Sequence, residues 1–497
     1  MLIKMLIKLA ICTAVFVSST ANAESRDFGE KVEKMLAKES KKLFGFKRPL
    51  SSSTTGSKIR TNGQSANDLI KVAKGLKAKI LTRKAAQSAD MFSFWPNEDN
   101  PEYLVFCIEG GVENLGTTLP GSTIEKLNPS VQRIDIDSGD VETILRGMDR
   151  CDGIRTTAWG TVLATEESGD GQAYELIDVA NTTNHTITDR ATGTIMDANG
   201  SPSTNIVKRD ALPVMAWEGL TVTEKGVVIA GDELRPGTAA EDDDGGAIFK
   251  FVPAIPHTGG LIDDLSESPL VNGSVYAFRA DCREETSGSF PQFGQGCEIG
   301  NGTWVLVSAA DARNSANANG ATGYYRPEDL HSDPTYTGPG IRFCWTNTGR
   351  EAASNYGEVI CGIDSEPFTA EPELATVVVN RFVEGDPDFN SLDNLAFQPI
   401  TGNLYVIEDH SNGDIFACLP DGADRNVKTD GCVKMLSVKD QSAEPTGFEF
   451  TADGKTAFLA IQHSNDSACG SGTDCADFDD YGTDDIAVIT GFKIKND

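Results

Sequence analysis

The sequence predicts an all-β protein, a six-bladed β-propeller that follows an N-terminal helical and low-complexity extension. The main observation is a set of six similar hairpin segments, each with two alternating apolar runs around a turn. The segments are ADMFSFWPNEDNPEYLVFCIEGG, IRTTAWGTVLATEES, MAWEGLTVTEKGVVIAGDE, GYYRPEDL with GIRFCWTNTG, DNLAFQPITGNLYVIEDH and PTGFEFTADGKTAFLAIQH. Most begin about 50 to 70 residues apart, the spacing of propeller blades with modest loops.

Further strand pairs between these hairpins complete each unit to four strands, the composition of a propeller blade. They include VQRIDIDSGDVETILRG, GAIFKFVPA with GSVYAFRA, GEVICGID with ATVVVNRF, and GDIFACL with VKMLSV. The third unit is longer and predicts an insertion around residues 255–320. A pair of β-sandwiches is the alternative fold, but it does not explain similar units that continue without a break in composition.

The N-terminus has two predicted parts. Residues 1–23 have a lysine-bearing start, an apolar centre and an Ala-Asn-Ala end, the pattern of a cleaved secretory signal. We therefore expect a mature chain from Glu24 in the periplasm or outside the cell, without membrane contact after cleavage. Residues 24–88 form the predicted extension, with a Ser/Thr/Gly-rich patch and an amphipathic helix over ANDLIKVAKGLKAKILTRKAA. Residues 89–497 form the propeller domain.

The charge balance limits the partners. Lys plus Arg number 43 against 74 Asp plus Glu, which gives a net charge of −31. A surface this acidic argues against nucleic acid as a partner, and it suits hard cations. We expect the protein to be a monomer.

Cysteine spacing suggests disulfides, because the predicted compartment permits them. Four local pairs are Cys282 with Cys297, Cys344 with Cys361, Cys418 with Cys432, and Cys469 with Cys475. Cys107 and Cys151 have no local partner. They could pair with each other. Alternatively, Cys107 packs as a small apolar side chain in YLVFCIE, and Cys151, before a polar Asp-Gly turn, binds a metal.

Acidic residues recur at the ends of the hairpins. A hairpin returns its second strand to the level where the first began, so Asp393 and Asn394 should lie beside Glu408 and Asp409. In a propeller the innermost strands line the axis, so acids from different hairpins should meet there. The other candidates are Glu109, Glu166, Glu167, Glu218, Asp232, Glu233 and Glu328. Any one of them could merely solvate a turn. Together they need cations, of which calcium is favoured.

Arg326 precedes Glu328 across Pro327, and residues two apart in an extended segment face the same side. A guanidinium beside a metal cluster would hold phosphate oxygens, whereas a surface salt bridge is the alternative. The sequence has no Gly-x-Ser-x-Gly elbow, zinc-type histidine pair or P-loop. His410 and His463 each follow a hairpin, where a polar contact is the favoured role.

These segments together resemble the PhoX family of bacterial alkaline phosphatases over roughly residues 88–495. That family consists of secreted six-bladed propellers whose active site combines iron with calcium. CDGIRTTAWGTVLATEES is similar to an early family segment and points to Cys151 with Glu166 or Glu167. WEGLTVTEKGVVIAGDELRPG carries Glu218, Asp232 and Glu233. GATGYYRPED matches the family's Arg-Pro-Glu segment, DNLAFQP with NLYVIED its Asp-Asn-Leu segment, and PTGFEFTADGKTAFLAIQH its closing blade.

The resemblance implies hydrolysis of small phosphate monoesters with Ca²⁺ and Fe³⁺ as cofactors. Glu328 would be catalytic as a metal ligand, and Arg326 would be catalytic by holding the phosphate. A metal-bound Cys151 requires iron or another transition metal, because calcium does not use sulfur. Two other classes remain open: a calcium-dependent propeller esterase or lactonase, and a non-catalytic, calcium-stabilised binding module.

Overall fold

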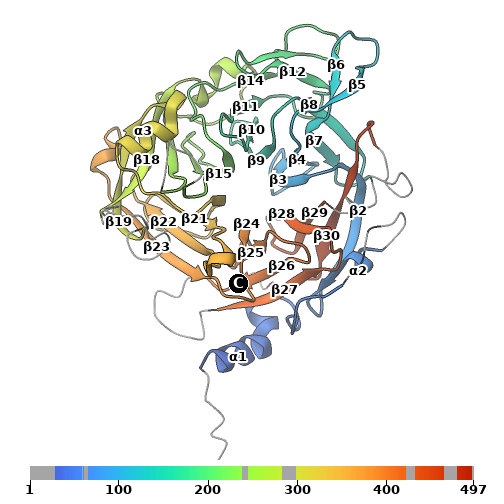
Figure 1. The fold of residues 1–497 in the computed structure, drawn as a ribbon, viewed down its shortest axis with the longest axis vertical. Coiled ribbons are helices and arrows are strands. Elements are labelled where there is room, and N and C mark those ends of the chain that lie inside the picture. Colours follow the sequence, from blue (N-terminus) through green and yellow to red (C-terminus); the bar gives the residue numbers. More distant parts are fainter. Residues whose placement is uncertain are drawn as a thin grey trace, which may run out of the picture.

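A computed structural model describes residues 28–56, 58, 60, 65–237, 244–281, 298–420, 431–463 and 478–494. Strands predominate within these ranges and are grouped in sheets around a central axis, so the fold is an all-β propeller (Figure 1). The predicted signal, residues 1–23, lies outside the described residues. Within the described part of the chain, no helix combines the length and the apolar character needed to cross a bilayer.

Each predicted hairpin segment contains one antiparallel strand pair, which confirms the hairpin predictions. The pairs are β3 (Ala89–Trp95) with β4 (Tyr103–Ile108), β9 (Cys151–Thr156) with β10 (Val162–Glu166), β15 (Trp217–Val222) with β16 (Val228–Asp232), β20 (Pro327–Ser332) with β21 (Ile341–Asn347), β24 (Leu392–Phe397) with β25 (Leu404–Glu408), and β28 (Glu444–Phe450) with β29 (Thr456–Gln462). We call β3, β9, β15, β20, β24 and β28 the first strands.

The first strands form a closed ring around the axis. Each packs beside the next in chain order, and β28 packs beside β3 to close the ring (Figure 1). Two glycines permit this close approach, because a Cβ at Gly153 on β9 would overlap the carbonyl oxygen of Glu218, and one at Gly219 on β15 would overlap the amide nitrogen of Leu330. A closed ring differs from the two facing sheets of a β-sandwich.

Outer strands complete the sheets. They are β7 (Pro129–Asp135), β8 (Val141–Arg146), β11 (Ala173–Leu176), β14 (Ile206–Lys208), β17 (Ile248–Pro253), β18 (Gly273–Ala280), β22 (Glu358–Asp364), β23 (Val377–Glu384), β26 (Asp414–Cys418), β27 (Cys432–Val438) and β30 (Thr483–Thr490). The first sheet is extended by β12 (His185–Asp189) and β13 (Thr194–Met196). In a nine-stranded sheet, β19 (Gly300–Val307) joins β15–β18 to β20–β23 by pairing with both β18 and β23.

The predicted helix over residues 66–86 is wrong. Only α2 (Ala66–Leu69) is helical, and it is followed by β1 (Ile70–Val72) and β2 (Lys77–Ala86). β1 pairs with β27, and β2 pairs with β30 at the opposite end of the chain. Cross-strand pairing thus overrides the helical pattern, a common outcome because tertiary context outweighs propensity. The N-terminal extension does contain a helix, α1 (Phe28–Leu43), whose Leu36 packs into the core.

The predicted insertion near residues 255–320 is only partly outside the sheets. It contains two short 3₁₀ helices, η1 (Leu265–Glu267) and η2 (Pro269–Val271), followed by the sheet strands β18 and β19. The remaining elements are η3 (Ala309–Asp311), α3 (Ala312–Ala318), η4 (Glu351–Ala353), η5 (Pro372–Leu374), β5 (Asn114–Thr118) and β6 (Glu125–Leu127).

Two of the predicted local disulfides are confirmed. Cys344 bonds to Cys361 across β21 and β22, and Cys418 bonds to Cys432 across β26 and β27. Each bridge joins residues that already face each other in the ladder. The pairs predicted for Cys282 with Cys297 and for Cys469 with Cys475 lie outside the described residues.

Candidate active site

An acid lies at or near the start of every first strand. These axial acids are Asp90, Asp152, Glu218, Glu328, Asp393 and Glu444. For all but Glu444, the register of the hairpin ladder shifts at the acid. Such bulges re-aim side chains and are frequent next to active sites. The bulges thus allow the strands to direct these acids toward the axis.

A second set of polar residues directly follows the second strand of each hairpin. These residues are Glu109, Glu167, Glu233, Thr348, Asp409 and His463. In five hairpins the backbone N–H of this residue donates to a carbonyl just before the axial acid's strand or at its edge: Glu109 to Ser88 (2.8 Å), Glu167 to Arg150 (2.7 Å), Glu233 to Ala216 (2.9 Å), Thr348 to Arg326 (3.3 Å) and Asp409 to Ser391 (2.8 Å). One repeated backbone contact therefore brings both sets to the same level.

Carboxylate oxygens at the axis form three sets with metal-ligand spacing. In each set the ligand atoms lie within 4.8 Å of one another. The sets are Asp90, Glu109 and Asp152; Asp152, Glu167 and Glu218; and Glu218, Glu328 and Asp393. They share Asp152 and Glu218, so they form one continuous cluster.

Several oxygens of this cluster are buried without a hydrogen-bond partner. They are Asp90 Oδ1, Asp152 Oδ1 and Glu167 Oε2. A buried carboxylate without a donor or a counter-ion is costly. These residues therefore fit bound cations, which would supply the missing positive charge.

Burial raises the pKa of the axial carboxyls, and neighbouring carboxylates raise it further. The affected groups are Asp90, Asp152, Glu167, Glu218, Glu328, Asp393 and Glu444. Glu233 differs, since a hydrogen bond to Glu167 and the Arg326 guanidinium outweigh its burial and hold its pKa below the usual range. Without cations, the carboxyls with raised pKa values therefore keep their protons to a higher pH than ordinary carboxyls do.

Three predicted metal ligands, Glu166, Asp232 and Glu408, do not join the cluster. Each immediately precedes an axis-facing acid on a second strand, and successive strand side chains point to opposite faces. The second acid of each pair, Glu167, Glu233 or Asp409, is the one whose charge raises the pKa of the axial acids Glu218, Glu328 and Asp393. None of the three preceding acids belongs to the three carboxylate sets found among the described residues.

The carboxylates of these three residues bind nearby backbone amides instead. Glu166 accepts from the N–H groups of Asp149 (2.9 Å) and Gln172 (3.0 Å) and pairs with Arg190. Asp232 accepts from Ala216 N–H (2.9 Å) and pairs with Arg313 (2.7 Å); Glu408 accepts from Asn390 (2.9 Å) and Asp414 (3.0 Å). We call these three the turn carboxylates, because they hold the chain around the hairpin ends.

Asp393 and Asn394 remain candidates. Asp393 belongs to the third set. Asn394 is 1% exposed, and neither its Oδ1 nor its Nδ2 has a partner among the described residues. A buried amide with both atoms unpaired fits a ligand role, because buried polar groups are otherwise almost always hydrogen-bonded.

Arg326 contacts the cluster. Its Nε donates to Glu233 Oε1 (2.6 Å), and its Nη2 lies 3.0 Å from Glu328 Oε1. The predicted meeting of Arg326 with Glu328 is thus present, although Arg326 is left-handed (φ 56°) rather than extended. A non-glycine residue in this region costs energy and often marks a functional site. The surrounding acids outweigh burial and raise the pKa of Arg326, so it stays charged.

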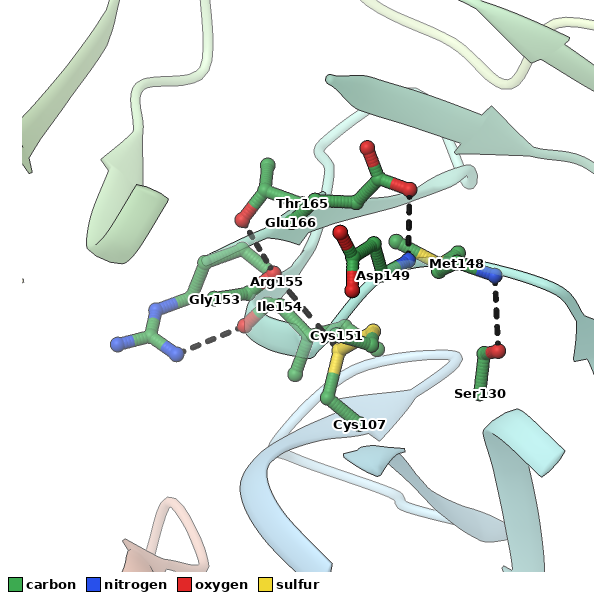
Figure 2. Close-up of a disulfide and its surroundings, with 10 residues drawn as sticks. All are labelled: Cys107, Ser130, Met148, Asp149, Cys151, Gly153, Ile154, Arg155, Thr165 and Glu166. Carbon is green, nitrogen blue, oxygen red and sulfur yellow. Dashed lines mark hydrogen bonds between the residues drawn. A yellow bond between two sulfur atoms is a disulfide. The ribbon is translucent and has the colours of Figure 1, made fainter. Parts of the chain in front are cut away.

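Cys151 is not free to bind a metal. It forms a disulfide with Cys107 on β4, with the Cα atoms 5.0 Å apart (Figure 2). Both cysteines are fully buried where β4 packs against β9. The prediction that Cys151 is a thiolate ligand is therefore wrong. Figure 2 also shows Glu166 bound to the backbone amide of Asp149.

Sequence reasoning missed Asp90, Asp152 and Glu444. It searched the ends of the second strands, whereas these acids lie where first strands begin. Alignment of the six hairpins on their first strands would have found them, since every one carries an acid there. His463 and His410 make polar contacts as favoured, with Glu444 (3.3 Å) and Glu408 (3.4 Å).

Comparisons with known proteins address the chemistry of this cluster. A family model described as alkaline phosphatase PhoX matches residues 137–465. The solved structure of Pseudomonas fluorescens PhoX in complex with vanadate, a transition-state analogue, is similar with a TM-score of 0.52 and 17% identity. The match covers 90% of this chain and 98% of that one.

Two weaker structural matches have TM-scores too low to support an argument. A Xanthomonas campestris gluconolactonase has a TM-score of 0.38 and 11% identity, over 88% of this chain and 96% of that one. A putative glucose dehydrogenase from Thermus thermophilus has a TM-score of 0.41 and 11% identity, over 84% and 100%. No curated protein sequence matches. Since the family model spans more than half of the 497 residues, the chain belongs to the PhoX family of alkaline phosphatases.

Proposed function

We propose that this phosphatase hydrolyses small phosphomonoesters at the axial acids, outside the cytoplasm, with calcium and iron as its bound cations. The observation that carries the proposal is the continuous cluster through Asp152 and Glu218, with Arg326 in contact with two of the neighbouring acids. The vanadate complex of the Pseudomonas fluorescens protein supports phosphoryl chemistry on this fold.

Calcium suits the three sets, because it takes several carboxylate and amide oxygens in flexible geometry. We propose Asp152, Glu167, Glu218, Glu328 and Asp393 as its principal ligands, with Glu233, Asn394 and Asp409 beside them. Iron would take oxygen ligands from the same cluster, because the sulfur of Cys151 is in a disulfide. Bound cations supply charge neutralisation to the phosphoryl oxygens and Lewis acidity.

Arg326 binds and orients the phosphate. Its side chain is 18% exposed, so part of the guanidinium remains open to a ligand. A guanidinium fork matches phosphate oxygens in geometry and charge. When phosphate binds, Arg326 exchanges part of its contact with Glu233 and Glu328 for contact with the substrate.

Glu328 is the proposed catalytic carboxylate and lies next to the Arg326 guanidinium. Its Oε1 accepts hydrogen bonds from the Thr348 hydroxyl and lies against Arg326. These two donors orient the carboxylate and partly offset the burial that raises the pKa of Glu328. Glu328 would therefore hold an oriented carboxylate toward the bound cations, next to the phosphate bound by Arg326.

We propose six blades, with the nine-stranded sheet counted as two blades that β19 joins. The mature chain would begin at Glu24, and residues 24–88 would add β1 and β2 to the propeller of residues 89–497, with the insertion near 255–320. The disulfides support a periplasmic or extracellular location. We propose that the protein acts as a monomer.

One experiment tests the function. Purified mature protein is analysed for metals, and hydrolysis of p-nitrophenyl phosphate is measured before chelation, after chelation and after return of calcium. We expect activity that disappears with the metals and returns with calcium, alone or with iron. If the protein hydrolyses a lactone but not p-nitrophenyl phosphate, the calcium-dependent esterase or lactonase is favoured. Calcium binding with neither activity would favour the non-catalytic binding module.

A further inference from the structure

Asp329 is a buried acid that belongs to none of the three carboxylate sets. It directly follows Glu328 on β20, and only 2% of it is exposed. The mechanism proposed above does not use it. Its carboxylate nevertheless contacts two neighbouring first strands, besides Leu330 and His331 on its own strand.

Two of these contacts reach strands that carry axial acids. Asp329 Oδ2 accepts a hydrogen bond from the backbone N–H of Leu395 (3.0 Å), two residues after Asp393 on β24. Asp329 Oδ1 lies 3.2 Å from Arg155 Nη2, and Arg155 stands three residues after Asp152 on β9. One carboxylate therefore links β20 to β24 and β9.

A glycine gives a third link. Gly219 follows Glu218 on β15, and a Cβ at this position would overlap both Asp329 Oδ1 and the Asp329 Cα. The lack of a side chain lets Asp329 lie directly on the backbone next to Glu218. Asp329 thus touches β9, β15 and β24 as well as its own strand β20.

The first strands need such links, because the ladders do not supply them. Among the described residues, β20 pairs only with β21, β24 only with β25, β9 only with β10, and β15 only with β16. No ladder in the described part of the chain therefore pairs one first strand directly with the next, and β15 and β20 are joined only through the outer strands of the nine-stranded sheet. Direct contacts between first strands therefore help to set their relative heights, and metal ligands are in general held by such supporting groups.

We infer that Asp329 is a positioning residue that sets the spacing of the axial acids Asp152, Glu218, Glu328 and Asp393. The inference rests on the proposed calcium site. Asp329 itself does not contact the cations or the substrate. It acts by keeping four strands at matched heights, so that their acids share ligand sets.

The test measures calcium affinity and metal-free stability separately in the full mature chain. Asp329→Ala and Asp329→Asn are compared with wild type by competition against a chromophoric chelator and by melting in excess chelator. Asp364→Asn is the matched control, because Asp364 is fully buried and binds Lys250 (2.7 Å) and Trp304 (2.9 Å) on outer strands.

We expect Asp329→Ala to weaken calcium binding by about 10- to 100-fold, the usual effect of removing a group that supports a metal ligand. Asp329→Asn should weaken it less, because its amide oxygen can still accept from Leu395. Asp364→Asn should lower the metal-free melting temperature and leave calcium affinity within about twofold.

Wild-type calcium affinity in both Asp329 variants would overturn the inference, as would an equal loss of affinity in Asp364→Asn. Failure of both Asp329 variants to fold while the control folds would also overturn it, since Asp329 would then be a folding determinant. A wild-type protein that binds no calcium would instead refute the proposed metal centre on which the inference depends.

Discussion

Adjacent acids at the axis and at the hairpin ends differ in the hydrogen-bond donors and positive charges around them. Glu166 and Glu167 are adjacent on the same chain and both are buried, yet Glu166 has two backbone donors and Arg190, whereas Glu167 Oε2 has no donor. The difference lies in the surroundings. The hairpin end offers N–H groups and a guanidinium to its carboxylate, and the axis offers mainly other carboxylates.

Asp232 with Glu233 and Glu408 with Asp409 share this arrangement in part, since Glu233 accepts a hydrogen bond from Arg326 (2.6 Å). In each case the turn carboxylate is bound by backbone amides, and its neighbour lies among the axial acids. A buried acid therefore indicates a cation site only where the protein leaves its charge unpaired. Arg326 is the principal cation that the protein itself supplies at the axis.

The largest expected effect separates an axial acid from a turn carboxylate. Glu328→Gln keeps the shape and removes one charge from the cluster, so we expect kcat to fall roughly a thousandfold or more with the fold retained. Glu408→Gln should lower stability while the folded protein keeps its activity. Assays of p-nitrophenyl phosphate hydrolysis with circular dichroism check both. Equal activity losses in the two variants would abolish the distinction.

The next effect compares two arginines that bind these two kinds of acid. Arg326→Ala should lower kcat/KM by an amount that corresponds to a loss of roughly 2–4 kcal/mol of transition-state stabilisation. The reason is that a guanidinium at the phosphate stabilises the charge that develops in the reaction. Arg313→Ala, which removes the partner of the turn carboxylate Asp232, should leave kcat/KM nearly unchanged in folded protein. Wild-type kinetics in Arg326→Ala would reduce that residue to a structural salt bridge.

The adjacent pair Glu166 and Glu167 allows the closest comparison. Glu167→Gln should weaken calcium binding by about 100-fold, at least as much as loss of a supporting group, because calcium affinity depends on the number of charged ligands, and should not lower the metal-free melting temperature. Glu166→Gln should cost about 1–3 kcal/mol of stability. The glutamine side chain has one acceptor oxygen, which cannot accept from both backbone N–H groups and from Arg190. Isothermal titration with calcium and thermal melting in chelator measure the two quantities. If Glu166→Gln instead weakened calcium binding and Glu167→Gln lowered stability, Glu166 would be the metal ligand and Glu167 the turn carboxylate.

The pH dependence of stability should differ between the metal-free and the calcium-loaded protein. The raised pKa values of the axial carboxyls mean that the native state binds more protons than the unfolded state. The free energy of unfolding without metal should therefore fall as pH rises above the ordinary carboxyl value of about 4. Calcium binds the charged form and should flatten this slope. Melting curves from pH 4.5 to 8, with chelator or with calcium, test this; parallel slopes would contradict it.

The smallest expected effect on activity concerns the disulfide beside the axis. Replacement of Cys107 and Cys151 together by alanine opens a bridge with a sequence separation of 44. We expect a loss of about 2–4 kcal/mol in stability, with the metal content and turnover of the folded protein retained. Metal analysis and denaturant unfolding measure both. Selective loss of iron in this variant would restore Cys151 as a ligand.

Sequence patterns predicted the hairpins well, because alternation and turn residues are local signals, as in Leu404–Glu408. They failed for residues 66–86, because the partner of β2 is β30, which lies at the other end of the chain. They placed acids near the axis without resolving which member of each adjacent pair faces it. That choice depends on the phase of the strand and on donors such as Arg190, which no local pattern reveals.

Crystals of the calcium-loaded mature protein provide the most direct test of the claim that the axial acids hold cations. Anomalous difference maps locate bound calcium and iron without assumptions about their ligands. We predict peaks at the axis, within ligand distance of the carboxylates of Asp152 and Glu218, and none beside Glu166, Asp232 or Glu408. Strong peaks beside these turn carboxylates, with none at Asp152 and Glu218, would contradict the account.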